Sequence, residues 1–351
     1  MTSDTPKPLT QAVTLQPFQA HWANDFAAAK LDIQRLLGPE CSQIEHIGST
    51  AIPSIDAKPI IDILIVVNDI DKVDQFNPAF IQSGYTPLGE NGIEQRRFFY
   101  RYQQHHSLHL HLYQSGNPHI QRHIAFRDYL IAHPNTAKAY SHIKRGLAAQ
   151  FPQEKQHYIE GKSTFIQMID YQTGQAQAAQ LNASDHIELF DPQAHWGKLA
   201  AAEIHAIQHH VNLPYARIEH LGSTAISGLP AKPVLDLFIA VSDINTATQW
   251  VTPLFELGYV FWAENPNKQH LRFFKGMPPY GTARSHHLHI MPDNQNFNDR
   301  VRFRDILLNN PKRREQYKQL KQQLAKQYQF DRERYTAKKS EFILQTLLAL
   351  S

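Results

Sequence analysis

Apolar residues recur at helical spacing from Trp22 to Leu37, where Gly38 and Pro39 end the pattern, so this segment is predicted to be a helix. A short strand is predicted over 44–47. The apolar, β-branched run from Pro59 to Val67 is typical of a strand buried on both faces. Asp62 interrupts that run. A carboxylate among buried apolar side chains has to be paired, protonated or bound to a metal ion.

The pattern changes further along the chain. A polar, helix-like stretch over 71–83 precedes two segments typical of adjacent strands, 97–102 and 108–113. From 119 to 168 the spacing is helical again, and Pro134 and Pro152 are placed to begin new helices. The expected fold class is α+β, a small mixed sheet packed by helices.

The same order of elements occurs twice. Residues 15–67 align without a gap with residues 189–241, and 23 of these 53 positions are identical, against roughly three for unrelated sequences. Three later blocks align at offsets of 175, 178 and 177: Arg97-Phe98-Phe99 with Arg272-Phe273-Phe274, His109-Leu110-His111 with His287-Leu288-His289, and Phe126-Arg127-Asp128 with Phe303-Arg304-Asp305. The unit is too long for a solenoid repeat and indicates two tandem domains. We expect them at 1–173 and 185–351, with a polar linker at 174–184 and equivalent sites in both copies.

Composition excludes several classes of protein. With 351 residues, 42% of them hydrophobic and 19% charged, the chain is neither disordered, collagenous nor a coiled coil. A formal net charge of +3 is small for a dedicated nucleic-acid-binding protein. The basic C-terminal helices could meet RNA, but a charge run is usually a solvated face. The single cysteine, Cys41, and the lack of a secretory or membrane-spanning pattern favour a cytoplasmic protein without a membrane role.

The strongest chemical signal is a Gly-Ser turn placed ahead of the strand aspartate. Gly48-Ser49 precedes Asp62 with twelve residues between them, and Gly222-Ser223 precedes Asp236 at the same spacing. This resembles the signature of the nucleotidyltransferase superfamily. The resemblance implies that the turn opens a helix whose N–H groups hold a nucleotide phosphate, and that the strand carboxylate binds a divalent metal ion. The alternative is that Asp62 caps a turn or pairs with a lysine or arginine.

More narrowly, six separated elements in each half resemble the GrpB family, a branch of that superfamily. In the first half they are EHIGSTAI from Glu45, AKPIIDI from Ala57, the Arg97, His109 and Phe126 blocks, and a KSxF motif from Lys162. The resemblance covers nearly all of each half and implies two tandem nucleotidyltransferase-like domains. Family members joined to dephospho-CoA kinase point to nucleotide or coenzyme A chemistry.

One position departs from the superfamily pattern. Active nucleotidyltransferases usually carry a second carboxylate two residues after the first, so that two acids share two metal ions. Leu64 and Phe238 occupy that position here. A standard two-metal site is therefore incomplete in both copies.

Histidines that alternate with leucine along a predicted strand are candidates for the missing metal ligands. His109 and His111 point to one face of a strand with Cα atoms ~6.6 Å apart, and the same holds for His287 and His289. With Asp62 or Asp236 they would form a two-histidine, one-carboxylate set for Mg²⁺, Mn²⁺ or Zn²⁺. The alternative is that these histidines only make hydrogen bonds within the fold.

Further residues complete the candidate sites. Two glutamates precede the Gly-Ser turns, Glu45 next to His46 and Glu219 next to His220. They are candidates for an acid, a base or an additional metal ligand. Thr50 and Thr224 continue the Gly-Ser turns as substrate-binding candidates. Five cations are placed to bind phosphate, with surface salt bridges as the alternative: Lys58, Arg97, Lys232, Arg272 and Lys275.

Two functions remain open at the level of sequence. The first is a metal-dependent enzyme that transfers or hydrolyses a group on a nucleotide or another phosphorylated small molecule. The second is a catalytically degenerate module that binds a nucleotide, coenzyme A or RNA. The leucine and phenylalanine at the second carboxylate position favour the second function.

Overall fold

The computed structural model describes residues 12–103, 105–179, 187–213 and 216–349, which divide into two compact units. Unit 1 comprises 1–148 and 169–177, and unit 2 comprises 149–168 and 178–351. Segment 149–168 thus belongs to the first copy by sequence repeat and to unit 2 by packing. The expected linker, 174–184, extends beyond the described residues at 180–184.

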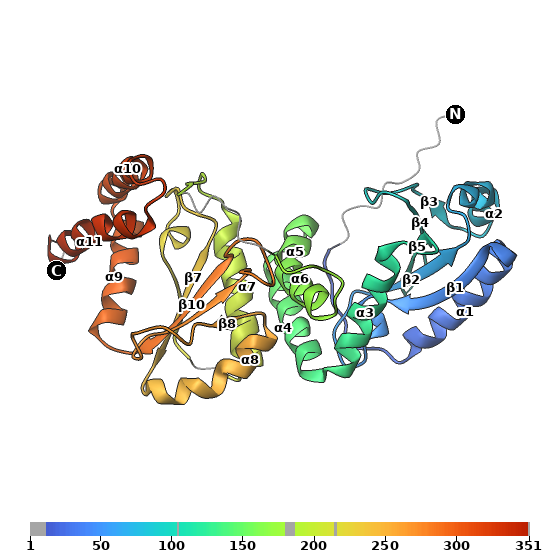
Figure 1. The fold of residues 1–351 in the computed structure, drawn as a ribbon, viewed down its shortest axis with the longest axis horizontal. Helices are drawn as coiled ribbons and strands as arrows, with labels where there is room; N and C mark the ends of the chain where they lie inside the picture. The colour runs from blue at the N-terminus through green and yellow to red at the C-terminus, as the bar shows by residue number, and fades with distance from the viewer. Residues whose placement is uncertain (1–11, 104, 180–186, 214–215, 350–351) are drawn as a thin grey trace. The chain divides into compact units, whose positions relative to one another are not determined.

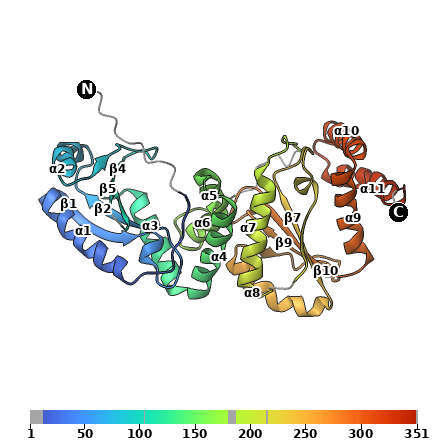
Figure 2. The same ribbon diagram turned by 180° about the vertical axis from the view of Figure 1, so that it is seen from behind.

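Each unit contains a five-stranded mixed sheet (Figures 1 and 2). The strands of unit 1 are β1 Cys41–Ile47, β2 Ile60–Val67, β3 Thr86–Pro87, β4 Arg96–Tyr102 and β5 Ser107–Gln114. Those of unit 2 are β6 Ile218–Leu221, β7 Leu235–Val241, β8 Val260–Phe261, β9 Leu271–Lys275 and β10 His286–Pro292. The spatial orders are β1-β2-β5-β4-β3 and β6-β7-β10-β9-β8. Only the central pairs, β2 with β5 and β7 with β10, are parallel within the described sheets.

Helices cover both faces of each sheet. Along the first copy they are α1 His21–Leu37, α2 Asn77–Gln82, α3 Pro118–Ala132, α4 Pro134–Gln150, α5 Lys155–Gly161 and α6 Ser163–Gln172. Along the second they are α7 His195–His210, α8 Val251–Glu256, α9 Gln295–Asn309, α10 Pro311–Gln327 and α11 Arg332–Ala349. The tandem α+β architecture is confirmed. No helix in the described ranges has both the length and the apolar character needed to cross a membrane.

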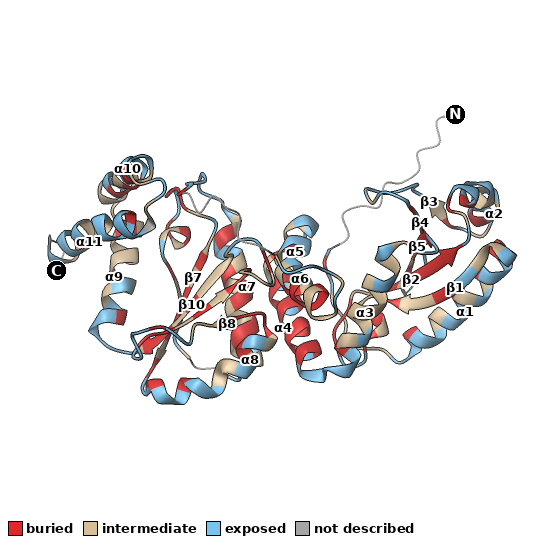
Figure 3. Ribbon diagram, in the orientation of Figure 1, coloured by how far each residue is buried: buried red, intermediate tan, exposed pale blue. Residues whose placement is uncertain are grey.

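The alternation of side chains in β2 decides which face of the sheet can carry chemistry. Ile61, Ile63 and Ile65 join the buried cluster that includes Trp22 and Ile33 of α1. Their neighbours in sequence, Asp62 and Leu64, point to the opposite face because successive side chains alternate. Helix α3 packs over β1 and β2, so β2 is buried on both faces, as expected, and appears mostly red in Figure 3.

Most expected elements are present within a few residues of their predicted limits. The stretch over 71–83 differs, because it begins as the 3₁₀ helix Asp71–Phe76 before α2. Pro134 is the first residue of α4, as expected. Pro152 does not begin a helix: it lies in the turn before α5, where its restricted φ is equally well accommodated.

The Gly-Ser turn leads into a single turn of 3₁₀ helix, not the longer helix expected. These turns are Ser49–Ala51 and Ser223–Ala225. Gly48 and Gly222 precede them with φ of 72° and extended ψ, a conformation that only glycine adopts without strain. A Cβ at either glycine would collide with the Oδ2 atom of the strand aspartate. The turn therefore rests directly on the carboxylate.

We predict that Gly48→Ala lowers the free energy of unfolding by about 2 kcal/mol or more. The energetic cost of a strained backbone and the cost of the collision with Asp62 add together. Gly92→Ala is the matched control, since Gly92 also has positive φ (81°) but open space around it; we expect about 1 kcal/mol there. Urea unfolding measures both. Equal costs at the two positions would contradict the close contact with Asp62.

Candidate functional site

In unit 2, Asp236, His287 and His289 converge on one face of the sheet. Parallel pairing places Asp236 of β7 beside His287 of β10, and Asp236 Oδ1 lies 3.0 Å from His287 Nδ1. One ligand atom from each of the three side chains lies within 4.8 Å of the others. The Nε2 atom of His287 is buried and has no hydrogen-bond partner among the described residues. These donors suit a single metal ion.

The same three positions converge in unit 1. Asp62 Oδ1 lies 3.2 Å from His111 Nε2 and 3.6 Å from His109 Nδ1. Burial alone would raise the pKa of Asp62, but its interactions with the imidazoles of His109 and His111 hold it well below its ordinary value. Asp62 is therefore ionised beside these imidazoles.

The second carboxylate position is apolar in three dimensions as well as in sequence. Leu64 is fully buried with Ile47 and Tyr113. Phe238 is buried and stacks on His289, with ring centroids 4.2 Å apart. Each copy thus offers one carboxylate and two imidazoles at this place.

The cluster of unit 2 lies in a cavity of about 660 Å³. One part of its lining consists of Gly222, Ser223 and Thr224 together with the cluster of Asp236, His287 and His289. A second part is basic and includes Lys232, Arg300, Arg304, Lys321 and Lys339. A third part is apolar and comes largely from α11, including Tyr335, Ile343 and Leu347. Asp236 and Asp299 are the acidic residues in the described lining. The cavity combines a cationic end with an apolar wall.

Two buried lysines were missed by the sequence analysis, which assigned Lys321 to a basic, solvated helix. Lys321 is only 2% exposed and donates to the backbone oxygen of Pro230. Its counterpart Lys144 is 1% exposed and donates to Ser49 Oγ over 3.0 Å. Burial, reinforced by the charge of Lys339, lowers the pKa of Lys321 to about 7. No local feature of the sequence distinguishes these two lysines from the other lysines of their helices.

His46 and His220 support the Gly-Ser turn. The Nε2 atom of His46 lies 3.0 Å from Thr50 Oγ1, and that hydroxyl donates to the backbone oxygen of Ile60. His220 and Thr224 repeat the contact at 2.9 Å. Burial lowers the pKa of both histidines to about 4. They are neutral donors that tie the turn to the sheet.

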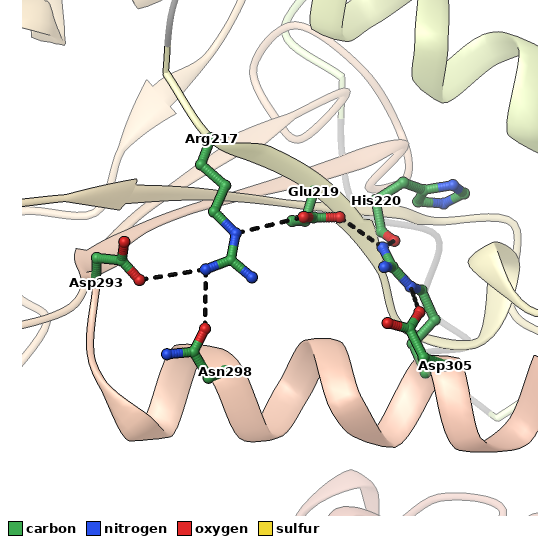
Figure 4. A network of polar contacts seen from close by, with 7 residues as sticks. Arg217, Glu219, His220, Asp293, Asn298 and Asp305 are labelled. Carbon is green, nitrogen blue, oxygen red and sulfur yellow. Dashed lines mark hydrogen bonds and ion pairs between the residues drawn. The ribbon is translucent and has the colours of Figure 1, made fainter.

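Glu45 and Glu219 are engaged in ion pairs. Arg127 donates to Glu45 Oε2 over 2.9 Å and also to the backbone oxygen of His46. Arg304 makes the same two contacts with Glu219 and His220. Figure 4 shows Glu219 and His220 within this polar network. Burial would raise the pKa of Glu45, but hydrogen bonds from Arg127 and Gln43 hold it below its ordinary value. Glu45, ionised and bound to arginine, does not supply a proton in this arrangement. The contacts of both glutamates tie β1 to α3 and β6 to α9, and their expected roles as a base or an extra ligand stay predictions.

The predicted equivalence of Arg97 and Arg272 is wrong by one residue. In β4, Phe98 pairs with His111, whereas in β9 Arg272 pairs with His289. Phe98 is therefore the counterpart of Arg272, and a one-residue shift reverses the face to which a side chain points. Arg97 lies on the face away from Asp62 and pairs with Asp74. Arg272 lies on the face that carries the histidine cluster.

Lys275 also departs from its expected role. It is 2% exposed, points to the core face of β9 and forms a buried ion pair with Glu203 of α7, with Nζ and Oε1 2.8 Å apart. It therefore cannot contact a ligand at Asp236. Lys232 lines the cavity, and its counterpart Lys58 is half-buried at the start of β2.

Fold and site together define a tandem α+β protein in which each domain sets a Gly-Ser turn against a carboxylate and two imidazoles. The chain belongs to the GrpB family: the family model described as "GrpB protein" matches residues 12–172 and again 186–348.

Several relatives support this assignment. UPF0157 protein YqkA of Bacillus subtilis is 43% identical over 176 residues, which cover 50% of this chain and 51% of the relative. Glutamate-rich protein GrpB of Alkalihalophilus pseudofirmus is 32% identical over 162 residues, 45% of this chain and 93% of that protein. The chain thus spans about half the length of YqkA and most of the length of the second relative.

Solved structures give two comparisons. The conserved protein GrpB from Enterococcus faecalis is 35% identical with a TM-score of 0.44, covering 46% of this chain and 96% of that one. The Cid1 poly(U) polymerase is 11% identical with a TM-score of 0.30, covering 38% of this chain and 43% of that one.

We predict that Lys275→Met lowers the free energy of unfolding by about 3–5 kcal/mol, because it leaves the Glu203 carboxylate buried without its partner. The double variant Lys275→Met with Glu203→Met should recover most of that loss. Lys198→Met, which breaks the exposed pair with Glu154, is the control and should cost less than about 1 kcal/mol. A single variant as stable as the wild type would contradict the buried pair.

Stability should fall between about pH 6.5 and pH 4. The pKa of His46, His220 and His286 is lowered by burial to about 4, and that of His123 to about 3. The unfolded chain therefore binds more protons than the folded chain in this window. Each histidine lowers the free energy of unfolding by roughly 1–2 kcal/mol as pH falls from 7 to 5.

The measurement is denaturant unfolding of metal-free protein at each pH. His46→Gln keeps a donor for Thr50 without the titration, so its pH dependence should be shallower. His105→Gln, at an exposed position, serves as the control. Parallel pH profiles for the wild type and His46→Gln would refute the assignment of His46.

Proposed function

We propose that the cavity of unit 2 binds a nucleotide or another phosphorylated small molecule, and that Asp236, His287 and His289 hold a divalent metal ion beside its phosphate. The single observation that carries the proposal is the position of this three-residue cluster in a cavity whose described lining holds five lysine and arginine side chains and two carboxylates. Asp62, His109 and His111 occupy the matching positions of unit 1, where the described residues form no equally close group.

The donor set supports a transition metal over magnesium. Mg²⁺ prefers oxygen ligands and near-octahedral geometry, whereas imidazole suits Zn²⁺ better. His289 Nδ1 lies 2.8 Å from His270 Nε2, which leaves its second ring nitrogen for a metal and fixes the orientation of the ring. When bound, such an ion would neutralise charge on a phosphate during transfer or hydrolysis.

The residues of the chain itself account for the binding of phosphate. Lys321, which donates to the backbone oxygen of Pro230, lines the cavity together with Lys232, Arg300 and Lys339. A phosphate in this cavity would meet several positive charges and few competing carboxylates. The apolar wall of α11 would receive the uncharged part of the ligand.

A binding module without catalysis is the second candidate. It is favoured by Leu64 and Phe238, because an apolar side chain replaces the second carboxylate in both copies.

The metal is tested by thermal unfolding and calorimetric titration of the full chain with Zn²⁺, Mn²⁺ and Mg²⁺. We expect Zn²⁺ or Mn²⁺ to stabilise the protein by about 2.7 kcal/mol at a concentration one hundred times the dissociation constant. Asp236→Asn should reduce the number of bound ions by one. Asp299→Asn, which removes an acid from the same cavity outside the cluster, is the control.

Catalysis is tested by phosphate or pyrophosphate release from a panel of nucleotides with the preferred ion. Turnover that is lost in Asp236→Asn supports the enzyme. Bound nucleotide without turnover supports the binding module. A protein that neither binds an ion nor responds differently after Asp236→Asn would overturn the metal site.

A further inference from the structure

Two arginines flank His289 in unit 2. Arg272 is paired in register with His289. Its guanidinium lies over the ring of Trp262, 5.6 Å from the ring centroid. Its Nε atom is buried and has no hydrogen-bond partner among the described residues. Arg300 of α9 lines the cavity, and its guanidinium lies over the ring of Phe238 at 5.4 Å. In the part of the chain that the structure describes, no ion pair joins either arginine to a carboxylate. Aromatic faces therefore hold both guanidinium groups in place.

The local charge is unbalanced. Desolvation lowers the pKa of Arg300 below its ordinary value, and the charge of Arg272 lowers it further, while only Asp236 acts in the opposite direction. Asp299, the other acid of the cavity, accepts a hydrogen bond from Gln295. Two guanidinium groups in one partly desolvated site repel each other unless an anion lies between them.

Unit 1 lacks this arrangement. The counterparts of Arg272 and Arg300 are Phe98 and His123, as strand register and the alignment of α3 with α9 establish. The arginine beside His111 is Arg96, which is 6% exposed. Its Nε and Nη2 atoms donate to the backbone oxygens of Glu90 and Asn91. Arg96 is thus occupied by the protein itself, whereas Arg272 is not.

We propose that Arg272 and Arg300 form an anion subsite specific to the second copy, which takes a phosphate or diphosphate group of the ligand beside His289. This inference deepens the proposed function and rests on it: Arg300 lines the cavity, and Arg272 lies close enough to Arg300 for their charges to interact. Planar guanidinium groups match phosphate oxygens in pairs. The first copy then accepts a ligand with less negative charge, and the two domains differ in specificity.

The test is calorimetric titration of the metal-free full chain with inorganic pyrophosphate. We expect one binding site per chain. The double variant Arg272→Phe with Arg300→His gives unit 2 the residues of unit 1 and should weaken pyrophosphate binding at least tenfold. The reciprocal variant, Phe98→Arg with His123→Arg, should add a second site in unit 1.

The control removes the same two charges elsewhere, in Lys326→Gln with Arg334→Gln, both of which are exposed. Circular dichroism checks folding. If the double variant does not fold, Arg300→His alone should still weaken binding, because that side chain borders the cavity rather than the core. Wild-type protein that binds no pyrophosphate, or equal losses in the variant and the control, would overturn the subsite.

The two proposals fail separately. Arginine-dependent binding of pyrophosphate without any response to metal ions supports the subsite and overturns the metal site. A metal response that requires Asp236, without arginine-dependent anion binding, supports the metal site and overturns the subsite.

Discussion

The contact between a glycine and a half-buried aspartate organises both domains. Gly48 and Gly222 leave no room for a side chain above the strand carboxylate, so turn and strand meet at a fixed distance. The parallel neighbour then places imidazoles beside the same carboxylate. Because the aspartate is only about a quarter to a third exposed, the turn and the histidines supply most of its surroundings. The same carboxylate therefore contacts both the glycine turn that packs on the strand and the imidazoles of the candidate site.

The sheet separates these two tasks by face. One face of β2 is entirely aliphatic and packs on α1, and the other carries Asp62. Since side chains alternate, the fold can gain core stability on one side while it keeps polar groups on the other. Lys275 and Arg272 illustrate the rule in β9: three residues apart, they face opposite sides, and one completes a buried ion pair while the other faces the histidine cluster.

The two copies share a scaffold but not a set of ligand contacts. Both retain the turn, the aspartate, the histidine pair and the buried lysine. They differ in the side chains around the second histidine, where Arg96, Phe98 and His123 of unit 1 correspond to His270, Arg272 and Arg300 of unit 2. Each member of the first group has a packing or hydrogen-bonding role in both copies. In the second group, Arg300 lines the cavity of unit 2.

The sequence by itself determined the duplication, the α+β class, the main helices and strands, and the grouping of Asp62 with His109 and His111. Hydrophobic periodicity and repeated motifs are local signals, and they were sufficient for these. Only the tertiary structure decided that Arg97 and Arg272 face opposite ways, that Lys275 and Lys321 are buried, and that Glu45 is bound by Arg127. It also decided that Lys144 reaches the Gly-Ser turn. Strand register and contacts between distant helices settle these points, because a one-residue shift or a helix packed from more than 80 positions away leaves no trace in local composition.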